Sequence, residues 1–252
     1  LSTTSFVSRI PAVSINRNAF AKVDPKYASI LDDYFQNGQI DVYPKKGKTS
    51  GAFCWGVGQL PTFVLLNYVN NLDAVSTLGH EMGHAIHTEF SKKQPVQYQH
   101  YSTSTAEVAS TFFEQVVSYE IEKTLTPKEK LVFMHNKLLD DMTTIFRQMA
   151  CYNFQVEFCE KIKNEGQVSK ESMAQLMSKH LRAYLGDAFD VSEDDGYFFV
   201  NWAHLRWFFY VYSYAYGQLV SKALFEKWKE DPSYAKKIEQ FLSAGRSMSP
   251  ES

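Results

Sequence analysis

The pattern of apolar and polar positions changes along the chain near residue 73. Residues 24–37 carry apolar side chains at helical spacing between an Asp-Pro start and a following glycine, which predicts a short helix. Residues 40–67 hold short β-prone runs separated by turn-forming sequences, which predict two or three strands of a small sheet. Beyond them a 3.6-residue period predicts helices at 73–91, 103–123, 127–164, 169–185, 201–229 and 231–243. We therefore expect one mainly α domain over residues 1–252, with a small β-sheet near its start.

Composition excludes several classes of protein. The chain has 252 residues with 26 basic and 28 acidic side chains, and a net charge of -2 offers no field to attract nucleic acid or an anionic membrane. No apolar run reaches the length of a membrane span, and no secretory leader precedes the first helix. Three cysteines without metal-binding or redox spacing fit buried side chains in a reducing, cytoplasmic compartment. The first residue is Leu1, which leaves a missing leader or N-terminal region open.

Within the range 73–91, the sequence HEMGH predicts a metal-binding helix. His80 and His84 are four residues apart and therefore lie on one helix face, where two imidazoles can share one ion. Glu81 lies at the edge of that face, as a general base for a zinc-bound water would. Small or apolar residues between the ligands suit close packing on a neighbouring helix. His87 is interpreted as a core residue or as a side chain that supports the metal ligands, because Phe90 occupies the position of a third histidine.

A catalytic zinc needs a third protein ligand, and the candidates lie on the range 103–123. Glu107, Glu114 and Glu120 are the available carboxylates, and Glu107 is favoured because small neighbours allow its helix to approach another closely. Glu114, two turns further on the same face, is the candidate partner for a histidine N–H. The alternative for Glu114 is a solvated surface carboxylate. We expect one zinc ion, although manganese or cobalt can occupy a His/His/Glu site.

These motifs resemble the thimet oligopeptidase family of zinc metallopeptidases, most closely its oligoendopeptidase F branch. The matching segments, in the order of the family, are KKGKTSGAFCWG, FVLLNY, LGHEMGHAIH, AEVASTFFE and HLRWFFYVYSYAYG. The resemblance implies a zincin-like catalytic domain and makes Glu107 the third zinc ligand. It also implies that the chain is the catalytic half of a longer enzyme. The missing N-terminal region, a possible partner of this half, forms the other wall of the channel in that family.

The resemblance assigns substrate contacts to two further segments. The strand GAFCW would be an exposed edge that pairs with a peptide backbone through Gly51, Ala52, Phe53 and Cys54, and the alternative is an ordinary interior strand. On the later segment, His204, Tyr210 and Tyr214 would hold the substrate carbonyl in the transition state. A one-residue slip of register would favour Tyr212 or Tyr216 instead, and a purely structural aromatic core is the other alternative.

The function predicted from these residues is zinc-dependent hydrolysis of internal bonds in short oligopeptides. Glu81 would deprotonate the zinc-bound water and then pass the proton to the leaving amine. One alternative is a carboxypeptidase or dipeptidyl carboxypeptidase, for which Arg182 or Arg206 would bind the terminal carboxylate. Another is a fragment that binds zinc and peptide without turnover when the N-terminal region is absent.

Overall fold

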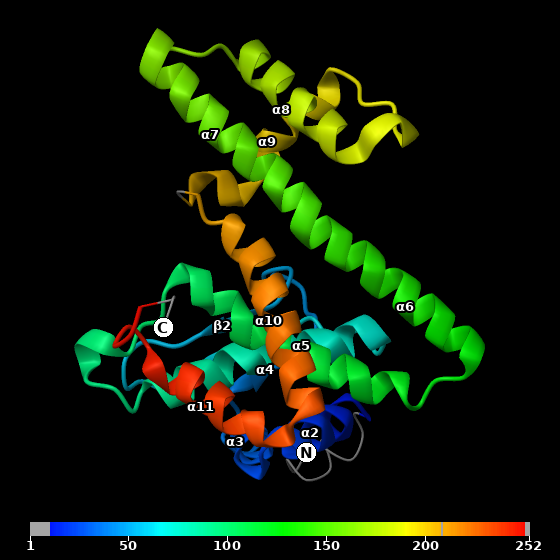
Figure 1. Ribbon diagram of the computed structural model, residues 1–252, viewed down its shortest axis with the longest axis vertical. Coiled ribbons are helices and arrows are strands. Elements are labelled where there is room, and N and C mark those ends of the chain that lie inside the picture. The colour runs from blue at the N-terminus through cyan, green and yellow to red at the C-terminus, as the bar shows by residue number, and fades with distance from the viewer. Residues whose placement is uncertain (1–10, 208, 250–252) are drawn as a thin grey trace. The chain divides into compact units, whose positions relative to one another are not determined.

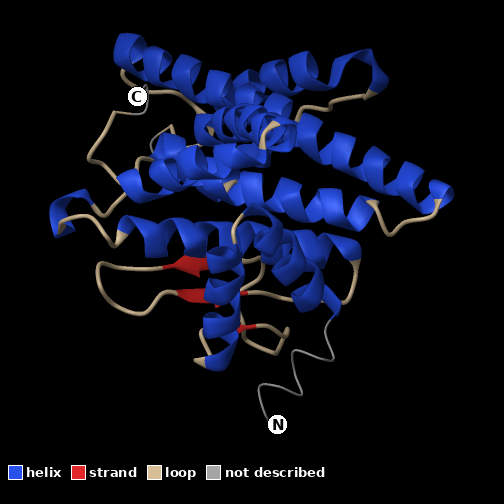
Figure 2. Cartoon of the chain, turned by 60° about the horizontal axis from the view of Figure 1, so that its bottom comes forward, coloured by secondary structure: helices blue, strands red, loops and turns tan. Residues whose placement is uncertain are grey.

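A computed structural model of the chain describes residues 11–207 and 209–249 (Figure 1). The described residues form two compact units, one up to Leu131 and from Leu219 onward, the other Val132–Gln218. Helices dominate, and three short strands form a single sheet (Figure 2). This confirms the predicted mainly α fold with a small sheet, whereas the single domain stays a prediction. No described helix has both the length and the apolar composition needed to cross a membrane.

Helices α2, α3, α4, α5 and α11 surround the core of the first unit. Their bounds are Pro11–Val23, Pro25–Gln36, Leu72–Ser91, Thr103–Glu122 and Ala235–Ala244. Helix α3 begins as predicted, because the Asp24 carboxylate accepts a hydrogen bond from Lys26 N–H and Pro25 occupies the first turn. Helix α2 was missed by the sequence pattern, although it packs against α4 and α5 and buries Ala12, Val13, Ala19 and Phe20 almost completely. Aromatic contacts of Phe113 with Phe20 and Tyr27 join α2, α3 and α5.

The sheet lies against helix α4. Strands β1 (Ile40–Asp41), β2 (Phe53–Trp55) and β3 (Phe63–Leu65) have the order β1-β3-β2, so β2 is an edge strand. β3 runs parallel to β1 and antiparallel to β2, with Cys54 opposite Val64. Val64 is buried, whereas Phe53 and Trp55 are exposed, so the sheet has one apolar face covered by α4 and one face open to solvent.

The second unit is built on a long helical segment. Helix α6 (Pro127–Met142) continues through a π-helical turn, Thr143–Arg147, into α7 (Gln148–Glu165), as the range 127–164 predicted. Helix α8 (Lys170–Leu185) packs on α7 around Phe154 and Met177. Short turns follow, with bounds Gly186–Ala188, Asp194–Tyr197, Phe198–Asn201 (α9) and Ala203–Arg206. Helix α10 (Tyr212–Glu230) then leads from this unit back to the first, where the short turn Pro232–Tyr234 precedes α11.

Two expectations from the sequence are wrong. The predicted helix 201–229 begins only at Tyr212, because the backbone turns at Phe209, whose φ of 56° lies in the left-handed region and cannot continue a right-handed helix. Burial of Trp202 and Val211 in the unit core holds this bent segment. The cysteines are free but not uniformly buried, since Cys151 is buried, Cys54 half-buried and Cys159 exposed.

Candidate metal centre

Helix α4 presents the two histidines of HEMGH on one face. The helix starts at a capped end, where the Asn71 side chain accepts a hydrogen bond from Ala74 N–H at 2.8 Å. Two and three turns later, His80 and His84 stand side by side with their ring centroids 5.0 Å apart. Both rings are largely covered, with side-chain exposures of 24% and 17%. One helix thus presents two imidazoles side by side on the same face.

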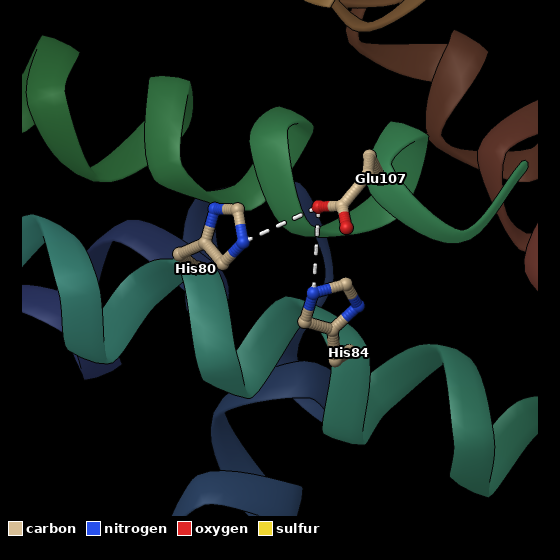
Figure 3. Close-up of side chains that lie close together, drawn as sticks. All are labelled: His80, His84 and Glu107. Carbon is tan, nitrogen blue, oxygen red and sulfur yellow. Dashed lines mark ion pairs between the residues drawn. The ribbon is translucent and has the colours of Figure 1, made fainter. Parts of the chain in front are cut away.

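Helix α5 approaches α4 unusually closely between those histidines. A Cβ atom added at Gly83 would lie 2.6 Å from Ser110 Cα and 2.9 Å from the Ala109 carbonyl oxygen, so only hydrogen fits there. The side chain of Glu107, one turn earlier on α5, is thereby brought over the histidine pair. Figure 3 shows the three side chains converging from α4 and α5.

The carboxylate of Glu107 points at both imidazoles. Its Oε2 atom lies 3.4 Å from His80 Nε2 and 3.6 Å from His84 Nε2 (Figure 3). One ligand atom from each residue lies within 4.8 Å of the others. The predicted set His80, His84 and Glu107, hereafter the metal centre, therefore comes together in space, with the third member supplied by the residue that the sequence favoured.

The electrostatics of the metal centre favour a bound cation. Burial opposes charge on Glu107, but the neighbouring His84 and His80 outweigh it and lower the pKa of Glu107 to about 2. Burial lowers the pKa of His84 to about 4, which leaves this imidazole neutral with a free lone pair. Burial also disfavours charge on His80, yet hydrogen bonds with Glu107 and Glu114 raise its pKa well above 6.5. The same carboxylates that favour a proton on His80 favour a metal cation in its place.

Glu81 provides an independent test of whether a metal and its water fit here. The side chain is 6% exposed, and its Oε2 atom has no hydrogen-bond partner among the described residues. An unpaired buried carboxylate oxygen is costly unless something polar occupies the space beside it. Burial raises the pKa of Glu81 to about 7, the range of a base that works near neutral pH. Two imidazoles, a carboxylate and this orphaned oxygen fit a catalytic zinc with one open position.

Glu114 lies behind the metal centre. Its Oε2 accepts a hydrogen bond from His80 Nδ1 at 2.9 Å. This contact leaves Nε2 as the ring nitrogen that faces Glu107, because a histidine that donates from one nitrogen presents the lone pair of the other. Glu114 thus pairs with His80, and its role as the support of a metal ligand stays a prediction.

Comparison with known proteins identifies the family of the chain. The sequence model of peptidase family M3 matches residues 6–252. The chain belongs to peptidase family M3. Its relatives include oligopeptidase PepF of Bacillus subtilis (strain 168), 30% identical over 233 residues, and an oligoendopeptidase F homologue of Borreliella burgdorferi, 32% identical over 230 residues. The resemblance to the oligoendopeptidase F branch is confirmed.

The M3 chain corresponds to a part of these relatives. The matches cover 91% and 89% of this chain but 35% and 39% of the two relatives. A putative peptidase from Chlamydophila abortus aligns with a TM-score of 0.75 and 26% identity, over 95% of this chain and 41% of that one. PZ peptidase A, solved with an inhibitor, aligns with a TM-score of 0.78 and 17% identity over 95% and 43%, which supports the fold alone.

The segment expected to bind peptide in this M3 chain is an edge strand. Phe53 and Cys54 belong to β2, and Gly51 and Ala52 precede it, with Gly51 at a φ of 80° that favours glycine. Strand β2 contacts α4, and Cys54 is its half-buried residue between the exposed Phe53 and Trp55. Burial raises the pKa of the Cys54 thiol, and the Glu81 carboxylate adds to the effect. The interior-strand alternative is therefore not what the sheet shows, whereas peptide binding stays a prediction.

The predicted carbonyl-binding residues cluster within the second unit of the M3 chain. His204 Nε2 lies 2.9 Å from the Tyr214 hydroxyl, and the His204 ring stacks on Tyr210 at 5.8 Å between centroids. Tyr210 precedes helix α10 rather than lying on it, and its ring meets Tyr214 edge to face. Tyr212 contacts Tyr152 instead. The structure therefore groups the favoured three residues with one another, and their role in catalysis stays a prediction.

His87 is packed as a core side chain. It is 1% exposed, and its ring stacks on Tyr101 with centroids 3.8 Å apart. Its Nδ1 atom has no hydrogen-bond partner among the described residues, and burial lowers the pKa of His87 to about 3. His87 is thus neutral at pH 7, and its contacts support α4 from the side of Phe241 and Tyr101.

The sequence pattern gave no sign of the side chains that hold the loop before β2. The side chain of Lys48 is 2% exposed, although it lies in a lysine-rich, turn-forming sequence that is typical of solvent-exposed loops. Asn67 follows β3 and donates two hydrogen bonds to the same loop. Only the three-dimensional pairing of β1, β3 and β2 brings these residues together.

Proposed function

We propose that this M3 chain carries the catalytic centre of a zinc-dependent endopeptidase that hydrolyses internal bonds of short oligopeptides. The observation that carries the proposal is the convergence of His80, His84 and Glu107 beside Glu81, whose buried Oε2 has no hydrogen-bond partner among the described residues. A structural zinc site is closed by four protein ligands, whereas this one leaves a position open next to a base.

The proposed mechanism uses the position of each side chain. His80, His84 and Glu107 hold the zinc, which when bound acidifies water and polarises the substrate carbonyl. Glu81 accepts the proton of the attacking water at Oε2, which has no hydrogen-bond partner in the described part of the chain, and then donates it to the leaving amine, a task suited to a pKa of about 7. Glu114 keeps His80 in the tautomer that ligates through Nε2.

The substrate is proposed to bind along the outer edge of β2. Backbone pairing with an extended peptide needs no particular side chain, which fits an enzyme of broad sequence preference. The phenol and imidazole groups of Tyr210, Tyr214 and His204 are proposed as donors to the developing oxyanion. The hydrogen bond between His204 and Tyr214 and the ring contacts of Tyr210 with both support this assignment over Tyr212 and Tyr216.

An activity assay with paired metal analysis tests the proposal. The purified chain and a Glu81→Gln variant are incubated with an internally quenched peptide of about eight residues, and zinc is measured in both. We expect the parent to cleave, and the variant to retain zinc while losing activity at least a hundredfold, the scale on which a general base contributes. A parent without zinc, or a variant as active as the parent, contradicts the mechanism.

One observation favours a second candidate, a half-enzyme that binds zinc and peptide but needs further chain for turnover. Met134, Leu138, Met142 and Phe146 follow one another at four-residue spacing on α6 and its π turn, and each is 45–57% exposed. The chain matches 35–39% of the length of its two relatives. The part of such a relative that lies outside this match is the proposed partner of the stripe. Zinc binding by both proteins without cleavage by either would select this candidate.

The carboxypeptidase alternative gains no support from the two arginines. Arg182 Nη2 donates to the Val191 carbonyl at 2.8 Å, and Arg206 donates to the Trp202 and Val200 carbonyls. Each guanidinium group thus contacts backbone carbonyls of its own unit, and an internal cleavage position remains our proposal.

A further inference from the structure

The outer edge of β2 depends on a loop that has little packing of its own. Residues 44–52 connect the β1 region to β2, and nearly all of them are exposed or half-exposed. Gly47 and Gly51 adopt φ values of 83° and 80°. Glycine is flexible at such positions, so without further contacts the loop would readily change its backbone conformation there. Something other than a hydrophobic core must hold this loop.

Lys48 is the first support. Its side chain is 2% exposed, and its ammonium group donates to the backbone carbonyls of Asp41 and Tyr43, both at 2.9 Å. The Asp41 carboxylate lies 3.1 Å away and balances the charge. Three oxygens therefore satisfy the three donors of a lysine, which makes this an oriented anchor rather than a surface ion pair.

Asn67 is the second support, and it acts on the residue where the binding edge begins. Its Nδ2 donates to the carbonyls of Thr49 at 2.9 Å and Gly51 at 2.8 Å. Gly51 is the first of the four residues, Gly51 to Cys54, proposed to receive the peptide. The amide of Asn67 thus fixes two carbonyls of the loop at once.

The far end of β2 is tied directly to the metal helix. Lys92, the C-cap of α4, donates from Nζ to the Leu60 carbonyl and the Thr62 hydroxyl, each at 3.0 Å, and to Glu89 at 2.8 Å. Lys92 therefore holds this end of the β2–β3 hairpin against the end of α4. The loop held by Lys48 and Asn67 determines the position of the other end of β2.

We propose that Lys48 and Asn67 are positioning residues for peptide binding, which keep the loop 44–52 in the conformation that leaves the outer edge of β2 ready to pair with substrate. The inference rests on the proposed peptidase function. A preformed edge spares the substrate the cost of ordering the loop, so losing either support should weaken binding while leaving the metal and Glu81 in place. Neither residue contacts the metal centre in the described structure.

Steady-state kinetics on three variants tests this role. In Lys48→Met and Asn67→Ala we expect KM to rise about tenfold, because backbone order must then be gained during binding, with kcat within about twofold and zinc content unchanged. Lys45→Met is the matched control, since Lys45 contacts the same Asp41 carboxylate at 3.3 Å but is 68% exposed. We expect its KM to equal that of the parent. Asn67→Ala keeps the test available if the lysine variant does not fold.

A binding measurement separates failure of this inference from failure of the proposed function. A fluorescent octapeptide is titrated onto the Glu81→Gln protein with and without Asn67→Ala, and anisotropy is recorded. Weaker binding with Asn67→Ala supports the inference. Equal KM or equal affinity overturns it while the peptidase function stands, and a combined loss of kcat and zinc overturns it in favour of a general structural role. If the parent neither cleaves nor binds peptide, the proposed function fails and the inference fails with it.

Discussion

Removing the Glu114 carboxylate should weaken metal binding without dismantling the metal centre. The 2.9 Å hydrogen bond from His80 Nδ1 fixes the ring and its tautomer, and such contacts typically contribute 10- to 100-fold in metal affinity, or about 1.4–2.8 kcal/mol. The Glu114 side chain is 33% exposed, so water screens the charge and can partly replace it. We therefore expect Glu114→Ala to bind zinc about tenfold more weakly, near the lower end of that range.

Competition with a chromophoric chelator measures this affinity directly. Glu122→Ala is the matched control, because Glu122 is on the same helix, is 30% exposed and pairs only with a surface lysine, Lys130, in the described contacts. We expect the control to retain the parent's zinc affinity. Equal affinities for the Glu114 and Glu122 variants would refute the reasoning that the hydrogen bond prepares His80 as a ligand.

Three further outcomes are expected from the same contacts. Gly83→Ala should lower the free energy of unfolding by about 1–3 kcal/mol in denaturant titration and weaken zinc binding, because its Cβ would meet Ser110 Cα at 2.6 Å; unchanged values would contradict the close approach. His87 has a pKa of about 3 when folded and about 6.5 when unfolded, so the unfolded state gains a proton first and stability falls as pH drops below 6.5. By pH 5 this protonation lowers the free energy of unfolding by about 2 kcal/mol, a loss that His87→Phe should avoid. The same dependence of the unfolding free energy on pH in parent and variant would contradict this prediction. A chelator should abolish cleavage and lower the Tm, and zinc should restore both; activity that survives complete metal removal would exclude the proposed mechanism.

Local sequence signals sufficed for the elements that carry the proposed metal ligands. Asn71 and Ser102 cap α4 and α5, and both helices span nearly the residues that their periodicity predicts. The HEMGH spacing then determines the relation of His80 to His84, because both lie on one helix. Local geometry is what a sequence pattern encodes best.

Elements whose form depends on distant packing were harder to predict. Helix α2 carries the buried polar residue Asn16, whose amide donates to the Val75 carbonyl on α4, and this weakens its apolar pattern. No glycine or proline lies next to Phe209, so the sequence carries no local signal for the bend there. The position of β2 at the sheet edge follows from the pairing order of the strands, which no single strand sequence contains.

The proposed third ligand, Glu107, is an intermediate case, because its position depends on how closely two helices pack. Small residues on both helices predicted a close approach of α5 to α4, and the contact of Gly83 with Ser110 and Ala109 is that approach. Its consequence is that Glu107 reaches both imidazoles with a single oxygen. A larger residue in this contact would move a ligand, whereas loss of the Glu114 hydrogen bond leaves every ligand in place. We therefore expect substitution of Gly83 to impair metal binding more than substitution of Glu114.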